Sequence, residues 1–315
     1  MERKQSMIKT IGLIGAGSVG TALISYLDRA YADDFYLLAR GDRAVRLKKN
    51  GISVNDCTLY PKIYAEESQK INIDLLIISV KCYSLDTVIE DIRGLIGKET
   101  IILPLLNGIM ATQRLREAFP ENRVLYGVML RTDAHRTGHK VYFTTSGEVQ
   151  IGYENNRVPA PEVQAVYECL KDSGINVRIY EDMRRTQWRK WLSNTGGSLA
   201  AVEVGVECGY FTQVEEIVEI IRLCMDEILL LARAEKVNLT EKDRDEMLDI
   251  LLHYPAHKKM SMLQDVEAGR PLEIDEYAGT VVQLGKKHGI VTPVNDILYK
   301  TIKAREKVDA LRKHI

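Results

Sequence analysis

The first half of the chain alternates short apolar runs with segments whose apolar residues recur at helical spacing. Strands are predicted at residues 7–14, 35–39, 73–80 and 100–105, and helices at 21–30, 84–96 and 110–118. Further strand candidates are 124–130, 141–144, 149–151 and 175–179. Strands that alternate with helices in this way are typical of a doubly wound parallel sheet, here with an antiparallel extension around residues 124–151.

The pattern changes near Met183, where the strand candidates stop. The remaining segments are apolar at helical spacing: 183–208, 213–236, 241–252, 258–268, 273–288 and 292–313. The sequence therefore predicts an α/β domain at 1–182 followed by an all-helical domain at 183–315. The long apolar segment 213–236 fits either a buried core helix or the interface of a homodimer, and its periodicity leaves both open.

A glycine motif connects the first predicted strand to the first helix. Gly15, Gly17 and Gly20 are spaced as G-x-G-x-x-G, directly after an apolar strand and directly before a helix. In that context the motif predicts a Rossmann-type dinucleotide-binding turn, with the pyrophosphate at the helix N-terminus. A glycine-rich turn without a ligand is the alternative. The loop residues predicted to bind the cofactor are Gly15, Ala16, Gly17, Ser18, Val19 and Gly20.

The end of the second predicted strand indicates which dinucleotide is bound. NAD-preferring domains carry a carboxylate there, about 20 residues after the glycines, which binds the ribose hydroxyls. This chain has Arg40 at that position. A guanidinium suits a 2′-phosphate, so we predict NADP(H). A solvated loop charge is the alternative reading of Arg40.

Composition narrows the class of protein further. The 315 residues include 43 basic and 44 acidic side chains, and the net charge of −1 gives no reason to expect nucleic acid or an anionic membrane as a partner. The chain shows neither an apolar run of transmembrane length nor the apolar segment of a signal peptide near its start. Its five scattered cysteines fit reduced thiols of a cytoplasmic protein, and neither they nor the histidines have metal-ligand spacing.

Two polar residues follow the apolar strands where the nicotinamide end of a dinucleotide is expected. Lys81 comes just after strand 73–80, and Asn107 just after strand 100–105. Asn107-Gly108 also fits a simple turn dipeptide. We expect the active site in the cleft between the two domains, at the carboxyl ends of the strands.

The helical half holds a candidate proton donor. Lys190 and Asn194 are four residues apart and share a helix face. Reduction of a ketone by hydride builds negative charge on oxygen, which needs a proton donor and a hydrogen-bond donor. Taken alone, this pair also fits ordinary surface polarity. Glu273 likewise fits a carboxylate that complements a helix start.

Together, these motifs resemble the ketopantoate reductase (2-dehydropantoate 2-reductase) family over nearly the whole chain. They are Gly15-Ala-Gly-Ser-Val-Gly20, Arg40, Ser79-Val-Lys81, Leu106-Asn-Gly108, Trp188-Arg-Lys190-Trp-Leu-Ser-Asn194, and Ser261-Met-Leu-Gln-Asp265 followed by Glu273-Ile-Asp275. The last block is the most specific of them.

The resemblance implies a role for each matching residue. Lys190 would be the general acid during hydride transfer from NADPH, and Asn107 would contact the nicotinamide and the substrate. Asn194 and Ser261 would bind oxygens of the 2-oxo acid substrate. Lys81 and Glu273 would line the cleft on the cofactor side, with Glu273 also catalytic, and Arg40 would hold the 2′-phosphate.

The sequence departs from the family at one predicted substrate-binding position. Ser198 stands where members with the pantoate activity carry a second asparagine, and Gly196 and Gly197 precede it. The two glycines are expected to loosen the helix by about 1 kcal/mol each. Three hypotheses follow: reduction of ketopantoate to (R)-pantoate in the pantothenate pathway, reduction of another 2-oxo acid, or a non-catalytic NADP(H) sensor. The presence of both Lys190 and Glu273 argues against the sensor.

Overall fold

The computed structural model describes residues 8–64 and 71–312. It divides into two compact units, the first ending at Arg184 and the second beginning at Arg185. Met7 of the first predicted strand and residue 313 of the last predicted helix lie outside the described residues.

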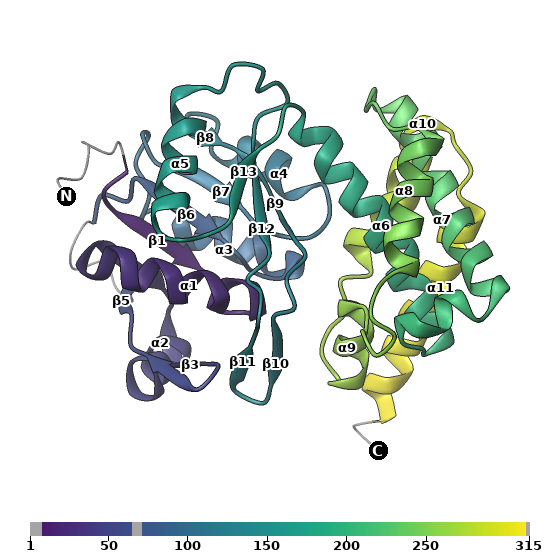
Figure 1. The fold of residues 1–315 in the computed structure, drawn as a ribbon, viewed down its shortest axis with the longest axis horizontal. Helices are drawn as coiled ribbons and strands as arrows, with labels where there is room; N and C mark the ends of the chain where they lie inside the picture. Colours follow the sequence, from purple (N-terminus) through teal and green to yellow (C-terminus); the bar gives the residue numbers. More distant parts are fainter. Residues whose placement is uncertain (1–7, 65–70, 313–315) are drawn as a thin grey trace. The chain divides into compact units, whose positions relative to one another are not determined.

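A parallel sheet of six strands forms the centre of the first unit (Figure 1). Its order is β5-β2-β1-β6-β7-β8, and every pair of neighbours is parallel. The strands are β1 (Ile11–Ile14), β2 (Phe35–Leu38), β5 (Lys62–Tyr64), β6 (Leu75–Ile78), β7 (Ile101–Pro104) and β8 (Arg123–Val124). The doubly wound sheet predicted from the alternating pattern is confirmed.

Helices cover both faces of this sheet because its central strands are apolar on both sides. Leu75 and Ile77 of β6 lie in one apolar cluster, which includes residues of α1 (Ser18–Tyr31) and α5 (Pro161–Asp172). Leu76 and Ile78 lie in the other, with residues of α3 (Leu85–Ile92) and α4 (Ala111–Ala118). Burial on both faces explains why these strands read as continuous apolar runs.

The antiparallel pairs of strands belong to two smaller sheets, each of which also contains one parallel pair. One has the order β13-β12-β9, built from β13 (Val177–Ile179), β12 (Glu148–Gly152) and β9 (Tyr126–Leu130). The other has the order β10-β11-β3-β4, built from β10 (His135–Thr137), β11 (Lys140–Tyr142), β3 (Ile52–Val54) and β4 (Cys57–Leu59). The single strand predicted at 124–130 is divided at Leu125, because β8 pairs with the main sheet whereas β9 pairs with β12.

Several elements of the first unit were not predicted. Helix α2 (Gly41–Asn50) buries only Ala44, so it carries no apolar stripe to mark it. Strands β3, β4, β5 and β10 have three residues each, which is too short for a clear alternation. Helix α5 was also missed, although Pro161 at its first position is a typical start signal.

The second unit is helical throughout its described residues, as predicted. Its helices are α6 (Met183–Val204), which begins at the end of the first unit, α7 (Glu215–Ala234), α8 (Glu241–Leu252), α9 (Ser261–Glu267), α10 (Thr280–His288) and α11 (Pro293–Arg312). The segment predicted as one helix at 273–288 is a π-helical turn, Asp275–Gly279, that leads into α10. Among the described helices, none is long and apolar enough to cross a membrane.

Candidate active site

The loop between β1 and α1 requires glycine at two of its three motif positions. Gly15 has a φ of +107°, and a Cβ there would lie 2.1 Å from the carbonyl oxygen of Ser79. A Cβ on Gly20 would lie 1.8 Å from the carbonyl oxygen of Gly15. These two glycines therefore let the loop pack against the end of β6 and against its own helix.

Gly17 differs from its two neighbours in the motif. A Cβ built on it meets no atom of the described part of the chain within 4 Å, so these residues leave the position open. Gly17 is also the N-cap of α1, and no side chain caps the helix or places an acidic group in its first turn. The uncapped N–H groups and the open space beside Gly17 fit the pyrophosphate of a dinucleotide.

Arg40 follows β2 and is the N-cap of α2. Its guanidinium makes two contacts with Asp91 of α3: Nη1 lies 3.0 Å from the carboxylate Oδ1, and Nη2 donates to the main-chain oxygen at 2.9 Å. Both side chains are partly exposed, 46% for Arg40 and 32% for Asp91. An ion pair this exposed contributes about 0.2–1 kcal/mol, so a phosphate dianion can compete with it for the guanidinium.

Lys81 and Asn107 follow the neighbouring strands β6 and β7, and both are half-buried. Cys82, the residue after Lys81, is buried and donates its thiol to the carbonyl oxygen of Asn107 at 3.0 Å. The glycine loop follows β1, the other neighbour of β6. The structure therefore brings the glycine loop, Lys81 and Asn107 to the carboxyl ends of three adjacent parallel strands.

Lys190 and Asn194 lie one turn apart on α6 and are both half-buried. Trp191 is almost fully buried, and its indole Nε1 donates to the carbonyl oxygen of Glu276 at 2.9 Å. Glu276 is three residues after Glu273, so this bond ties the turn that carries Lys190 to the segment that carries Glu273. The rings of Trp188 and Trp191 pack edge to face at 5.2 Å between centroids, which fixes this part of α6 further.

Glu273 and Ser261 lie in different environments. Glu273 is 4% exposed and precedes the π-helical turn, whereas Ser261 is exposed at the first position of α9. Between them, the buried carboxylate of Asp265 accepts a hydrogen bond from Arg270 Nε at 2.7 Å. That ion pair holds the turn that follows α9, on the way from Ser261 to Glu273.

The glycines before Ser198 allow close packing of α6, which remains one continuous helix. A Cβ on Gly196 would lie 3.0 Å from the carbonyl oxygen of Ile221 in α7. A Cβ on Gly197 would lie 3.1 Å from side-chain carbons of Leu251 and Met260. The sequence predicted that Gly196 and Gly197 loosen the helix. That prediction did not take into account the close packing that the absence of their Cβ atoms permits.

Two hydroxyl groups in this stretch are buried without a hydrogen-bond partner among the described residues. They belong to Thr195 and Ser198, and both residues are 0% exposed. A buried hydroxyl without a hydrogen-bond partner costs about 1–3 kcal/mol of folding stability, so such groups are few in native proteins.

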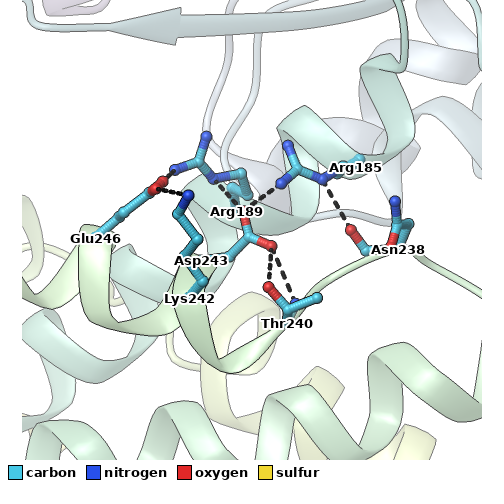
Figure 2. A network of polar contacts seen from close by, with 7 residues as sticks. All are labelled: Arg185, Arg189, Asn238, Thr240, Lys242, Asp243 and Glu246. Carbon is cyan, nitrogen blue, oxygen red and sulfur yellow. Dashed lines mark hydrogen bonds and ion pairs between the residues drawn. The ribbon is translucent and has the colours of Figure 1, made fainter.

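The start of α6 is held by a network of charges that the sequence did not reveal (Figure 2). The carboxylate of Asp243 is 3% exposed and accepts hydrogen bonds from Arg185 and from the main-chain N–H of Thr240, the latter at 3.0 Å. Arg189 Nε lies 3.1 Å from the same carboxylate, and its Nη2 donates to Glu246 at 2.6 Å. Arg189 directly precedes Lys190, so this network orients the turn that carries Lys190.

Both units match family models. Residues 11–156 match "Ketopantoate reductase PanE/ApbA", and residues 182–306 match "Ketopantoate reductase PanE/ApbA C terminal". A curated relative, "2-dehydropantoate 2-reductase" of Aquifex aeolicus (strain VF5), is 25% identical over 311 residues, which are 95% of this chain and 98% of the relative.

Solved structures share the fold. A dimeric ketopantoate reductase from Staphylococcus aureus superposes with a TM-score of 0.81 at 21% identity, covering 95% of this chain and 99% of that one. A D-mandelate dehydrogenase solved with NADH and anilino(oxo)acetate superposes with a TM-score of 0.84 at 24% identity, covering 95% and 99%.

These matches, together with the glycine loop on a doubly wound sheet, define an oxidoreductase of a family that uses a nicotinamide dinucleotide. The chain belongs to the ketopantoate reductase family, because the two family models together cover most of its length.

Proposed function

We propose that this protein reduces 2-dehydropantoate to (R)-pantoate, with NADPH as the hydride donor, in pantothenate biosynthesis. The observation that carries the proposal is the match to both family models, in order, within one chain. The curated relative from Aquifex aeolicus bears the name of this activity.

The preference for NADPH is supported by Arg40. It stands after β2 where a carboxylate would select NAD, and its present partner Asp91 is partly exposed. The open space at Gly17 and the uncapped start of α1 fit the pyrophosphate. In this proposal Lys81 and Asn107 line the nicotinamide side, from the carboxyl ends of β6 and β7.

When bound, NADPH would supply the hydride that the carbonyl carbon of the 2-oxo acid accepts. Lys190 donates a proton from Nζ to the carbonyl oxygen as the carbon–oxygen double bond becomes a single bond. Asn194, one turn further along α6, donates a hydrogen bond to a substrate oxygen. Ser261 binds a second substrate oxygen, and the carboxylate of Glu273 orients the cofactor ribose and the substrate.

The domain roles follow from this assignment: residues 1–182 hold NADP(H), and residues 183–315 hold the substrate. A cytoplasmic location fits the five cysteines, all of them described and all free thiols. A homodimer is proposed by analogy with the Staphylococcus aureus structure. Light scattering on the purified protein tests it, and a monomeric mass at working concentration rejects it.

The activity is tested by following NADPH oxidation with ketopantoate and with a panel of other 2-oxo acids, with NADH in parallel. We expect ketopantoate with NADPH to give the highest kcat/KM. A different preferred acid would reject the substrate, and NADH matching NADPH would reject the role of Arg40. Tight NADPH binding without turnover of any acid would favour a sensor.

A second candidate keeps the reaction but changes the 2-oxo acid. The observation in its favour is Ser198, which stands where the pantoate enzymes carry asparagine and whose buried hydroxyl has no hydrogen-bond partner among the described residues. The D-mandelate dehydrogenase that shares this fold was solved with anilino(oxo)acetate, an acid that carries an aromatic ring, so aromatic 2-oxo acids belong in the panel.

Ser198→Ala tests whether this hydroxyl contacts substrate. Removing an unsatisfied buried hydroxyl is expected to leave the melting temperature unchanged or higher. If Ser198 binds substrate, KM for the preferred acid rises about 3- to 30-fold, as for one lost hydrogen bond. Thr195→Val is the matched control, because it removes a second unpartnered hydroxyl from the same helix. Equal KM values for both variants and the wild type would remove Ser198 from the site.

A further inference from the structure

Arg136 reaches the glycine loop from a distant part of the chain. It lies on β10, and its Nη2 donates a hydrogen bond to the carbonyl oxygen of Ala16 at 2.5 Å, across 120 residues of sequence. Ala16 lies between Gly15 and Gly17, so the guanidinium is bonded to the loop one residue before the open position at Gly17. Neither the glycine motif nor the family resemblance pointed to this residue.

The fold holds Arg136 in this place through the hairpin of β10 and β11. Arg136 pairs with Val141, and Val141 pairs in turn with Val54 of β3. The main-chain N–H of Asn55 donates to the carbonyl oxygen of Val141 at 2.8 Å. The hairpin is therefore an integral part of the first unit, where it belongs to the sheet β10-β11-β3-β4 (Figure 1).

A second contact fixes the end of the hairpin against α1. The Phe143 and Tyr26 rings are 6.5 Å apart between centroids, and Tyr26 belongs to α1. The Phe143 main-chain N–H also donates to Asn55 Oδ1 at 2.9 Å. The hairpin is thus attached to α1 through Phe143 and to the loop before it through Arg136.

The electrostatics at this place favour an anion. A helix N-terminus carries about half a positive charge, so a cation beside it is unfavourable unless negative charge is present. The first turn of α1 has no acidic side chain, and its N-cap is Gly17. Arg136 therefore adds positive charge where the helix already provides it, an arrangement that a bound dianion would stabilise.

We propose that Arg136 is a clamp on the pyrophosphate of the bound dinucleotide. The guanidinium has five N–H donors in a planar fork, so one can stay on the Ala16 carbonyl oxygen while others donate to a phosphate oxygen. The pyrophosphate is common to NADPH and NADH, whereas the 2′-phosphate assigned to Arg40 is present in NADPH alone. The inference rests on the proposed dinucleotide site and adds a residue to it.

Binding of both dinucleotides to Arg136→Ala tests the clamp. Titrations with NADPH and with NADH, followed by fluorescence, should give dissociation constants raised by the same factor for both, roughly 10- to 100-fold for a charge-assisted contact. Arg136→Lys keeps the charge but loses the fork, and it should recover part of the affinity for both.

Two further variants serve as controls. Lys140→Ala removes one exposed positive charge from the same hairpin and should change either constant less than about 3-fold, the range of a surface charge. Arg40→Ala should weaken NADPH and leave NADH unchanged. The melting temperature of each unliganded variant shows whether the loop itself has been damaged.

Three results would overturn the clamp: Arg136→Ala binding both dinucleotides as the wild type does, a loss confined to NADPH, or a loss of affinity that Lys140→Ala reproduces. A melting temperature lowered in Arg136→Ala, with Arg136→Lys restoring stability but no affinity, would assign the residue to loop structure instead. Failure of the wild type to bind either dinucleotide would reject the proposed function as well. A wild type that binds, with an unaffected Arg136→Ala, rejects the clamp alone.

Discussion

Two glycines of the same loop, Gly17 and Gly20, are expected to respond in opposite ways to the same added methyl group. An alanine Cβ at position 20 would lie 1.8 Å from the carbonyl oxygen of Gly15, far inside any allowed contact. An alanine Cβ at position 17 would meet no protein atom within 4 Å, and the φ of Gly17, −78°, is one that alanine adopts freely. Gly20→Ala therefore tests packing, and Gly17→Ala tests ligand binding.

The magnitudes follow from these distances. Gly20→Ala forces α1 and the loop apart, and overpacking of this kind costs about 2–4 kcal/mol of unfolding free energy. For a unit of this size, that lowers the melting temperature by roughly 4–16 °C. Gly17→Ala reduces the entropy of the unfolded chain but replaces a better N-cap residue, so its net effect is within about 0.5 kcal/mol. Its Cβ occupies the space assigned to the pyrophosphate, so we expect NADPH affinity to fall about 10- to 100-fold.

The assay is thermal unfolding of both variants without ligand, followed by NADPH titration of each one that folds. Gly17→Ala should have the melting temperature of the wild type and should bind NADPH weakly. Wild-type affinity in Gly17→Ala would refute the assignment of that space to the pyrophosphate. A wild-type melting temperature in Gly20→Ala would show that the contact between loop and helix is looser than described here.

Three other predictions concern separate parts of the chain. Arg40→Ala should raise the NADPH dissociation constant about 10- to 100-fold in fluorescence titrations and leave NADH unchanged; equal losses for both would reject a 2′-phosphate role. Asp243→Asn should destabilise the protein by about 2–3 kcal/mol in urea unfolding, because two partly exposed arginines lose a buried carboxylate; a change under about 0.5 kcal/mol would reject the network. Burial raises the pKa of the Cys169 thiol to about 12 and that of the Cys208 thiol to about 11. At pH 8 a disulfide reagent should therefore react quickly with the exposed Cys57, and with Cys169 and Cys208 only when the protein unfolds. Fast reaction of Cys169 or Cys208 in the folded protein would contradict their burial.

Features governed by local backbone constraints were readable from the sequence. The glycine loop could be predicted because its strand, turn and helix are contiguous, and because no residue with a Cβ fits at Gly15 or Gly20. The position of Arg40 could be predicted because its distance in sequence from the glycine loop places it just after β2. The doubly wound sheet followed from apolar runs that the structure buries on both faces.

Pairings between distant segments were not readable. Arg136 reaches Ala16 through a hairpin of two three-residue strands, which has no clear alternation to identify it. Asp91 meets Arg40 across 51 residues, and Asp243 meets Arg185 across 58. In each case a charged residue looks like any other in the sequence until the fold supplies its partner. Helix α2 was missed for a related reason, since it buries a single residue.

The proposed reduction depends on Lys190 as the proton donor, and Lys190→Ala removes that donor. The steady-state rate of NADPH oxidation with the preferred 2-oxo acid, measured with saturating NADPH, should fall about 10²- to 10⁴-fold relative to the wild type. The NADPH dissociation constant of the same variant should stay within about 2-fold, because the cofactor contacts proposed here come from the first unit and from Glu273. Turnover within a few-fold of the wild type would contradict the role of Lys190 and mean that another residue is the general acid.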